Sequence, residues 1–311
     1  MVNLPFEIIK LIRPIHWVKN FALFAALIFS GLLTQPGYLT PVIWAFIIFN
    51  MAASATYVFN DLLDAEKDAR HPIKKNRPIA KGVVPKELAL FISAVLATSS
   101  LTLANQLSHL FFLIVLGYLL LQVGYSLFLK NLPIIDILII ASGFVIRVYA
   151  GAVIINAHLS VWFLLCVISV ALFLASGKRR AELGTVGKDA LTRSSLKKYS
   201  IELLNSYVTM FANAAWLSWS LFTFFESPET AQPFWLLLAE LSRTTTVDKL
   251  LMATIPVTIF AIMRYQSLIF EDRSEAPESI LLKDKWLVSS VGLWGLMVIW
   301  ILYGGISVGT L

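Results

Sequence analysis

Three aspartates lie at helical spacing in the segment NDLLDAEKDARHPIKKNRP, residues 60–78. Asp61, Asp64 and Asp68 are separated by three and four residues, so a helix through them would carry all three on one face. Carboxylates stacked in this way repel one another unless a cation lies among them, and their hard oxygen atoms suit Mg²⁺. We therefore predict that these three aspartates are catalytic and bind Mg²⁺.

Basic residues follow the aspartates directly. Lys74, Lys75 and Arg77 could contact phosphates held by the same metal, because Mg²⁺ commonly bridges to substrate phosphates and Arg forms two-pronged contacts with them. We predict substrate contacts for Lys75 and Arg77, and also for Asn60, which lies one turn before Asp64. The alternative is a solvated loop whose basic residues only mark one side of a membrane, and for the lysines the sequence leaves this open.

The composition indicates an all-α integral membrane protein. Of its residues 58% are hydrophobic and 14% are charged, and the mean hydropathy is +0.77. Apolar stretches of about 20 residues, long enough to cross a bilayer, recur along the chain. None alternates like a barrel strand, so we predict helices in a single domain, residues 1–311. The nine predicted spans are residues 18–34, 41–59, 87–105, 108–128, 134–155, 160–176, 203–225, 249–270 and 286–308.

The basic residues are distributed unequally between the two sides of this predicted bundle. If the nine spans alternate in direction, 21 of the 25 Lys and Arg residues fall on one side, and only Arg243 and Lys249 fall on the other. Cytoplasmic loops retain positive charge. We therefore predict a multi-pass protein of the cytoplasmic (inner) membrane, with the N-terminus and the aspartates facing the cytoplasm and the C-terminus outside.

Other polar residues lie in or beside the predicted spans. Arg147 is about 13 residues into the fifth span, where an ionisable group is costly and usually faces a polar cavity, so we predict a substrate-binding or pairing role. Tyr125 and Lys130 close the fourth span on the cytoplasmic side, and we predict substrate contacts there, with snorkelling of Lys130 as the alternative. Asp136 fits the start of a helix better than a catalytic role.

Several stretches in combination resemble a known family. NDLLDAEKD is similar to the first aspartate motif of the UbiA superfamily, membrane-embedded helical enzymes that act on polyprenyl substrates. The resemblance narrows to the decaprenyl-phosphate phosphoribosyltransferase branch, and it is weak beyond residue 205. The stretches that narrow it are RPIHWVKN (13–20), HPIKKNRPIAKG (71–82), YSLFLKNLPIIDILIIASGFVIRVYAGA (125–152) and SGKRRAEL (176–183).

The resemblance implies a fold and a reaction. The fold is a UbiA-like bundle of nine transmembrane helices with cytoplasmic catalytic loops. The reaction is the Mg²⁺-dependent transfer of 5-phosphoribose from phosphoribosyl pyrophosphate to a decaprenyl-like polyprenyl phosphate, in the synthesis of cell-envelope polysaccharide precursors. The resemblance also implies a phosphate contact for Lys19. Aromatic prenyltransferases of the superfamily have a second acidic motif where this chain has Lys178 and Arg179, with Glu182 as the remaining carboxylate. Bases in place of acids favour substrates with more phosphate charge, so we predict substrate contacts for Lys178, Arg179 and Glu182.

Two other functions are weighed against this one. An aromatic prenyltransferase that uses a prenyl diphosphate would fit the first motif, but the stretch GKRRAEL counts against it. A membrane transporter would also bury Arg147, but transporters usually place ion sites near the bilayer midplane rather than at a helix end. The expected partners are phosphoribosyl pyrophosphate, a polyprenyl phosphate and the bilayer, with no nucleic acid. The length of the lipid and the oligomeric state, including a homo-oligomer, stay open.

Overall fold

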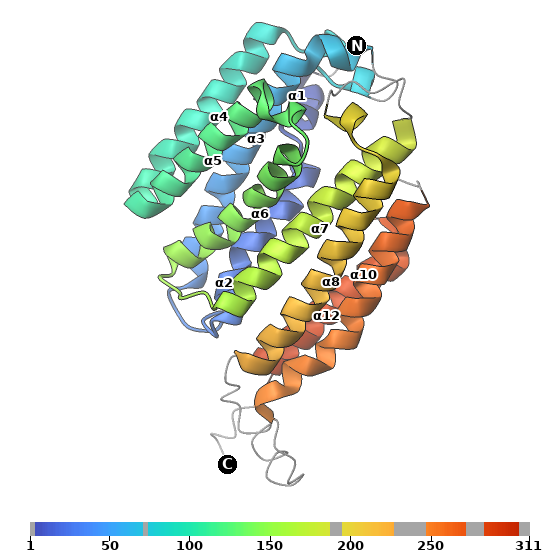
Figure 1. Ribbon diagram of the computed structural model, residues 1–311. Helices are drawn as coiled ribbons and strands as arrows, with labels where there is room; N and C mark the ends of the chain where they lie inside the picture. Colours follow the sequence, from blue (N-terminus) through green and yellow to red (C-terminus); the bar gives the residue numbers. More distant parts are fainter. Residues whose placement is uncertain (1–3, 71–73, 187–194, 227–246, 272–282, 305–311) are drawn as a thin grey trace. The chain divides into compact units, whose positions relative to one another are not determined.

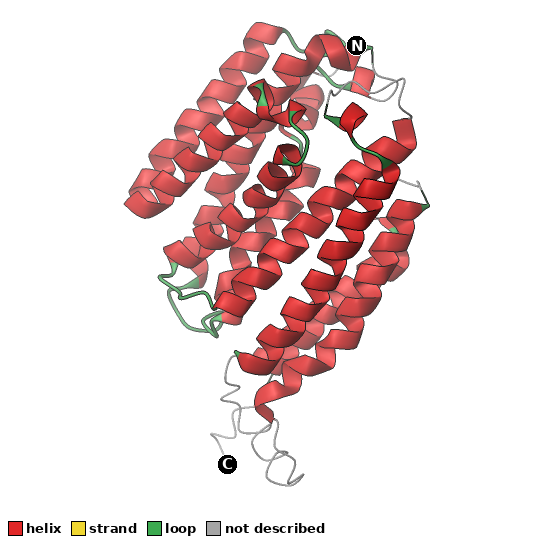
Figure 2. Cartoon of the chain, in the orientation of Figure 1, coloured by secondary structure: helices red, strands yellow, loops and turns green. Residues whose placement is uncertain are grey.

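The structure is a computed structural model that describes residues 4–70, 74–186, 195–226, 247–271 and 283–304. Within these ranges every regular element is a helix (Figure 2). In chain order (Figure 1), the elements are α1 (Leu4–Ile12), η1 (Pro14–Leu23), α2 (Phe24–Phe29), α3 (Leu39–Ala69), η2 (Lys74–Asn76), α4 (Lys86–Leu107), α5 (His109–Leu127), η3 (Leu129–Asn131), α6 (Ile135–Ile154), α7 (Val161–Val186), η5 (Leu196–Lys198), α8 (Ile201–Phe225), η6 (Val247–Thr254), α10 (Ile255–Phe270) and α12 (Lys285–Tyr303).

The predicted helical membrane architecture is confirmed. Among the described residues, nine helical stretches are long and apolar enough to cross a membrane. Two of them extend about ten residues beyond the prediction, because α3 continues to Ala69 and α7 continues to Val186. In both cases the apolar run ends first and the helix continues through a polar stretch that includes the good helix formers Leu, Ala, Glu, Lys and Arg. The acidic and basic motifs therefore lie on helices rather than in loops.

The first span differs most from its prediction. The predicted stretch was 18–34, whereas the helical structure begins at Leu4 and ends at Phe29. It consists of three pieces, and the ten residues of its middle piece, η1, form a 3₁₀ helix that begins at Pro14. Pro favours such a start because it has no N–H to leave unpaired. After Phe29 the chain turns at Gly31, whose φ of 74° is one that Gly adopts without strain.

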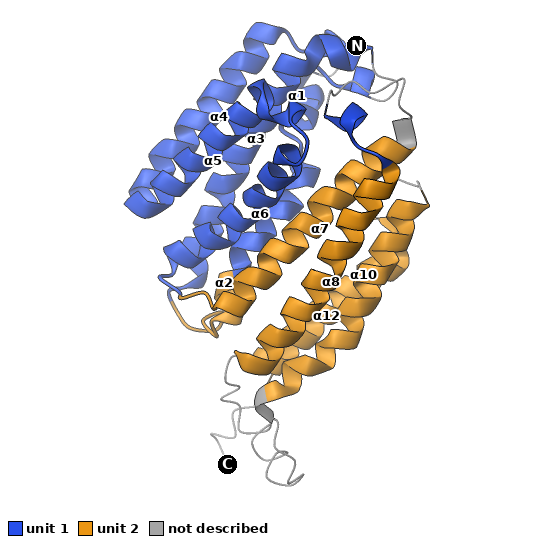
Figure 3. Ribbon diagram, viewed as in Figure 1, with its two compact units in different colours: residues 1–25, 37–157, 186–200 blue, residues 26–36, 158–185, 201–311 orange. Residues whose placement is uncertain are grey.

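The chain forms two compact units (Figure 3), and each is described by itself. In unit 1 (residues 1–25, 37–157 and 186–200), α3 packs against α1, η1, α4, α5 and α6. Its core includes Phe49 of α3 and Phe111 of α5, both fully buried. A Cβ on Gly151 of α6 would collide with the carbonyl group of Leu23, so only Gly permits this close approach of α6 to η1.

Unit 2 contains residues 26–36, 158–185 and 201–311. An aromatic cluster fills part of its core, where the Phe29 ring lies 5.1 Å from the ring of Phe163 and 5.7 Å from that of Trp219. Arg264 of α10 donates to both carboxylate oxygens of Asp284, at 3.1 and 2.7 Å, and Asp284 also caps the first turn of α12. The hydrogen bond from Arg264 lowers the pKa of Asp284, so this aspartate stays charged and joins the two helices.

The orientation of the spans in the membrane can be tested with single cysteines. The one natural cysteine, Cys166, is buried and can be replaced by Ala to remove background labelling. Lys81, between α3 and α4, and His158, between α6 and α7, are both exposed. We expect a membrane-impermeant maleimide to label His158→Cys in intact cells, and to label Lys81→Cys only after permeabilisation, because Lys81 belongs to the basic side.

A second position that is predicted to face the cytoplasm provides the control for this labelling experiment. Lys198, in η5, is exposed and should behave like Lys81. Labelling of Lys81→Cys and His158→Cys from the same side would contradict the alternating topology.

Candidate active site

The last turns of α3 carry the three predicted aspartates. Residues 59–69 contain neither Pro nor Gly and include the helix formers Leu, Ala, Glu and Lys, so the helix continues to its end at Ala69. Asp61 and Asp68 are buried, and the side chain of Asp64 is 13% exposed. The aspartates therefore lie on one helix, as their spacing predicted, and each must be neutralised.

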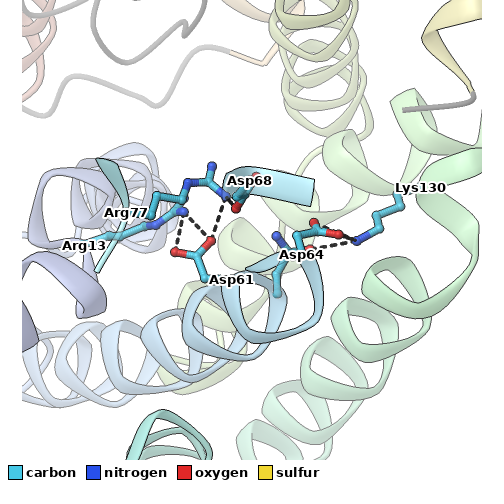
Figure 4. Close-up of polar contacts among 7 residues, drawn as sticks. Arg13, Asp61, Asp64, Asp68, Arg77 and Lys130 are labelled. Atoms are coloured by element: carbon cyan, nitrogen blue, oxygen red, sulfur yellow. Dashed lines mark hydrogen bonds and ion pairs between the residues drawn. The ribbon is translucent and has the colours of Figure 1, made fainter. Parts of the chain in front are cut away.

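Arg77 joins two of the aspartates (Figure 4). Its Nη1 atom donates to Asp61 Oδ1 at 2.9 Å and to Asp68 Oδ2 at 2.5 Å. Asp61 and Asp68 are seven residues apart, almost two full turns, so their side chains leave α3 in nearly the same direction. Arg77 therefore contacts the acids themselves, and the phosphate contact predicted for it stays a prediction.

Arg13 is the second cation at Asp61, and the set of residues predicted from the sequence did not include it. Its Nη2 atom donates to both carboxylate oxygens, at 2.5 and 2.7 Å, and its guanidinium lies 5.5 Å from the centre of the Tyr57 ring. Arg13 stands between α1 and η1 with a φ of 53°, a left-handed conformation that is uncommon for a residue other than Gly. The signal in the sequence was its place at the head of the motif-like stretch 13–20.

Lys130 neutralises the third aspartate. Its Nζ atom donates to the two oxygens of Asp64 at 2.7 and 2.8 Å, and Asn60 Oδ1 lies 3.4 Å away (Figure 4). Lys130 is only 4% exposed, so this is a buried contact rather than snorkelling toward water. Asp64 points to Lys130 and not to Arg77 because it is displaced about 60° around the helix from Asp61.

A small pocket opens beside these contacts. Its lining contains two acids and four bases, so positive charge is in excess. Such a pocket favours an anion, and phosphate in particular, because Lys and Arg both donate strongly to phosphate oxygens. The lining residues are Asp64, Lys67, Asp68, Lys74, Arg77, Lys130 and Asn131.

The donor set has the chemistry of a Mg²⁺ site, because the candidate ligands are carboxylate oxygens. Asp61 and Asp68 already converge on one positively charged atom, Nη1 of Arg77, and these two fit a small cation shared between them. Asp64 faces Lys130 instead. Within the described ranges, no three Asp, Glu, His or Cys side chains come together as a group that could hold a metal ion.

Besides Asn60, four predicted contact residues of unit 1 do not line this pocket. Lys75 is exposed in η2, and its neighbour Lys74 lines the pocket in its place. Lys19 lies within η1, and Tyr125 lies near the end of α5. The substrate contacts proposed for these residues stay predictions.

Arg147, the fourth of these residues, is in the core of unit 1. It is 4% exposed, and its Nε atom donates to Asn20 Oδ1 at 2.5 Å while Nη2 donates to the Tyr118 hydroxyl at 3.1 Å. Asn20 in turn donates to Asn50 of α3. The guanidinium also donates to the Gly143 carbonyl. Arg147 thus pairs with polar groups of η1, α5 and α6, in agreement with the pairing role predicted for it.

The basic motif SGKRRAEL lies on α7, in unit 2. Arg179 is fully buried and forms an ion pair with Glu182, one turn later on the same helix. Arg180 donates to Asn205 of α8 at 2.7 Å, and Lys178 is half-buried beside them. The sequence did not reveal that Arg179 and Glu182 pair with each other, although their spacing of three residues allows it.

Comparisons with known proteins show a family and several relatives to which the chain is similar. A family model described as the UbiA prenyltransferase family matches residues 21–179. A protein of Mycobacterium tuberculosis named decaprenyl-phosphate phosphoribosyltransferase is 36% identical over 290 residues, which cover 92% of this chain and 90% of the relative. A protein of the same name from Corynebacterium glutamicum is 34% identical over 308 residues, covering 97% of this chain and 88% of the relative.

Solved structures show the same fold at low sequence identity. A UbiA homolog from Archaeoglobus fulgidus bound to GPP and Mg²⁺ has a TM-score of 0.69 and 17% identity, covering 95% of this chain and 98% of that chain. A UbiA homolog from the same organism was also solved with Cd²⁺ and has a TM-score of 0.64. These structures bound divalent metals, and their likeness to this chain supports the fold.

Removal of Arg77 should destabilise the protein more than removal of Arg13. Arg77→Ala leaves Asp68 without its cation and Asp61 with one, whereas Arg13→Ala leaves both aspartates bonded to Arg77. Because the Arg77 side chain is 25% exposed, we expect a loss of about 1–3 kcal/mol, less than the 3–5 kcal/mol typical of a fully buried pair. Reversible unfolding in detergent measures it.

An exposed ion pair provides the matched control for this stability measurement. Lys86 and Glu66 lie 3.6 Å apart with side chains 57% and 86% exposed, so Lys86→Ala should cost about 0–1 kcal/mol. Equal losses for Arg77→Ala and Lys86→Ala would show that the acid cluster does not depend on Arg77.

Proposed function

The chain belongs to the UbiA prenyltransferase family, and from this premise we propose that it transfers 5-phosphoribose from phosphoribosyl pyrophosphate to a polyprenyl phosphate, with Mg²⁺ as cofactor. The relatives that match nearly the whole chain are named for transfer to decaprenyl phosphate. The main support from the structure is the pocket at the end of α3, where four bases outnumber two acids. A donor with a 5-phosphate and a diphosphate suits such a pocket.

The charges of the cluster favour binding of the donor together with its metal. Three aspartates face three cations, Arg13, Arg77 and Lys130, so the cluster itself is close to neutral. A diphosphate alone would place anions beside three carboxylates, and a divalent cation alone would add charge beside three bases. Mg²⁺ cancels part of the negative charge of the donor and the excess bases of the pocket lining can balance more of it, so we expect the donor and Mg²⁺ to enter the site as a complex.

The proposed reaction exchanges one bond at the anomeric carbon of ribose. An oxygen of the lipid phosphate forms a bond to this carbon, while the bond from the carbon to the pyrophosphate oxygen breaks and its electron pair leaves with pyrophosphate. Mg²⁺ bound there would neutralise the charge that develops on the leaving group. An ionised phosphate needs no strong base in order to attack, so the protein contributes chiefly by positioning the substrates.

Different residues of the cluster would bind the metal and the diphosphate. Asp61 and Asp68, which share one cation, would hold the metal, with Asp64 contributing from the adjacent turn. Arg77, Lys130 and the pocket lysines would contact the diphosphate, because each has N–H groups beyond those bonded to the aspartates. We propose that Lys178 and Arg179 on α7 contact a phosphate that does not react.

The proposed reaction also indicates on which side of the membrane the active site would lie. Its donor is soluble and charged, whereas its acceptor is a lipid, so the basic side of the bundle would face the cytoplasm from the cytoplasmic membrane. The acceptor would enter from the bilayer. This placement agrees with the distribution of Lys and Arg along the chain.

A direct assay tests this proposal. Purified protein, Mg²⁺, phosphoribosyl pyrophosphate labelled in the ribose and a polyprenyl phosphate should give label in the organic phase. EDTA should abolish the transfer and added Mg²⁺ should restore it, because the carboxylates alone cannot neutralise a leaving pyrophosphate. Full activity in chelator would exclude the metal role. Consumption of a prenyl diphosphate with an aromatic acceptor, and no use of phosphoribosyl pyrophosphate, would overturn the proposal.

Substitutions on the two sides of the pocket should affect different kinetic constants. Asp68→Asn removes a contact that strengthens as the leaving group gains charge, so kcat should fall more than KM rises. Lys74→Ala removes a contact with phosphate that is similar before and during the reaction, so it should mainly raise the KM of the donor. Each loss should be roughly 10- to 200-fold, which corresponds to about 1.5–3 kcal/mol.

Variation of both substrates separates these effects, and Lys86→Ala, an exposed base outside the pocket lining, is the control. Unchanged kcat in Asp68→Asn together with unchanged KM in Lys74→Ala would contradict the division of roles.

A further inference from the structure

The turn that follows Lys130 has an unusual backbone. Between η3 and α6, Ile134 has φ 69° and ψ −51°. A β-branched residue rarely adopts a positive φ, because its side chain then crowds the backbone. Such a conformation persists only where surrounding contacts impose it, and it is often found next to functional groups.

A tyrosine from the α7–α8 connection imposes this conformation. The Tyr199 hydroxyl accepts a hydrogen bond from the Ile134 backbone N–H at 2.5 Å and donates to Asp136 Oδ1 at 2.8 Å. Tyr199 is 3% exposed and Asp136 is fully buried. One hydroxyl therefore holds both the strained peptide and the first turn of α6.

A serine from the same connection contacts Lys130 itself. Ser195 Oγ donates to the backbone carbonyl of Lys130 at 2.9 Å, and Asp136 Oδ2 lies 3.3 Å from the same hydroxyl. Ser195 is fully buried. The side chain of Lys130 donates to Asp64, so this residue is held at one end by α3 and at the other by residues 195–199.

We propose that Asp136, Ser195 and Tyr199 are positioning residues for Lys130 and form a latch, named here the 195–199 latch, between the α7–α8 connection and the active site. The latch fixes the backbone of Lys130 so that its Nζ atom lies among the oxygens of Asp64 and Asn60. The inference deepens the proposed function, on which its role in binding a diphosphate rests.

The geometry at Lys130 explains why such a latch is needed. A lysine has four rotatable bonds and loses much conformational freedom when it is fixed, so its backbone must be set before the ammonium group can be placed accurately. Displacements of about 1 Å in groups that position a substrate are costly for catalysis. Lys130 has to meet α3 from a separate element, and the latch removes the freedom of the turn between η3 and α6.

Hydrogen exchange tests the latch without any assay of activity. Tyr199→Phe removes only the hydroxyl, so amide exchange in residues 129–138 should become at least roughly 10-fold faster, because the Ile134 N–H loses its acceptor. Tyr149→Phe is the matched control, since Tyr149 is 43% exposed on α6. Unchanged exchange in Tyr199→Phe, or equal changes in the two variants, would overturn the proposal.

A double-mutant cycle then tests whether the latch acts through Lys130. The measured quantity is the affinity of the full-length protein for inorganic pyrophosphate in the presence of Mg²⁺. Tyr199→Phe should weaken binding roughly 10- to 100-fold, the range seen when a hydrogen-bond partner of a metal ligand is removed. In a Lys130→Ala background the same substitution should change affinity less than about 2-fold. Additive losses would show that Tyr199 has only a general structural role.

Substitutions of Ser195 provide a second test of the latch. Ser195→Ala should reproduce the loss of affinity, and Ser195→Thr should restore most of it because the hydroxyl is kept. If Tyr199→Phe fails to accumulate in the membrane, this pair decides the question, and equal affinities in Ala and Thr overturn the latch. If the wild-type protein binds pyrophosphate but transfers no phosphoribose, the proposed function fails while the exchange and affinity measurements still test the latch.

Discussion

Unit 1 is organised around the need to neutralise three aspartates at the end of one helix. Removing a charge from water costs several kcal/mol per ion, and a buried pair recovers this cost only with good geometry. The cations come from distant parts of the chain, because Arg13 lies 48 residues and Arg77 lies 16 residues from Asp61, while Lys130 lies 66 residues from Asp64. The α1–η1 junction, the segment after α3 and the turn before α6 must therefore meet at one point.

The same unit buries another cation in a different way. Arg147 contacts an amide oxygen, a backbone carbonyl and a hydroxyl, and its guanidinium lies 5.3 Å and 5.1 Å from the rings of Phe49 and Tyr118. Aromatic faces attract a cation most strongly where water is excluded. Polar groups from several elements thus stabilise the charge of Arg147, whose hydrogen bonds connect η1, α5 and α6 in the core of unit 1. The three aspartates, in contrast, connect the end of α3 to Arg13, Arg77 and Lys130.

Much of this arrangement follows from local patterns in the sequence. Apolar runs predicted the spans, and the spacing of Asp61, Asp64 and Asp68 placed them on a helix, because both properties depend on neighbouring residues alone. The partners of the aspartates depend on tertiary packing, so the predicted residues did not include Arg13, and the sequence did not show that Lys74 lines the pocket while Lys75 does not. The positive φ of Ile134 has no signal of its own, since Ile normally avoids it.

Lys130 contacts both a residue that the sequence pattern predicted to be in the site and a residue that it did not predict. Its side chain bonds to Asp64, a residue that the motif reveals, while its carbonyl bonds to Ser195, a residue that no motif reveals. A lysine on a flexible loop would lose conformational entropy when it binds a substrate, and this loss would weaken binding. A lysine whose backbone and ammonium group are already held by hydrogen bonds has lost that entropy during folding. The strained turn at Ile134 is consistent with this account, because strain is retained where the neighbouring contacts outweigh it. The accuracy of the site then depends on residues 195–199 as much as on the aspartates themselves.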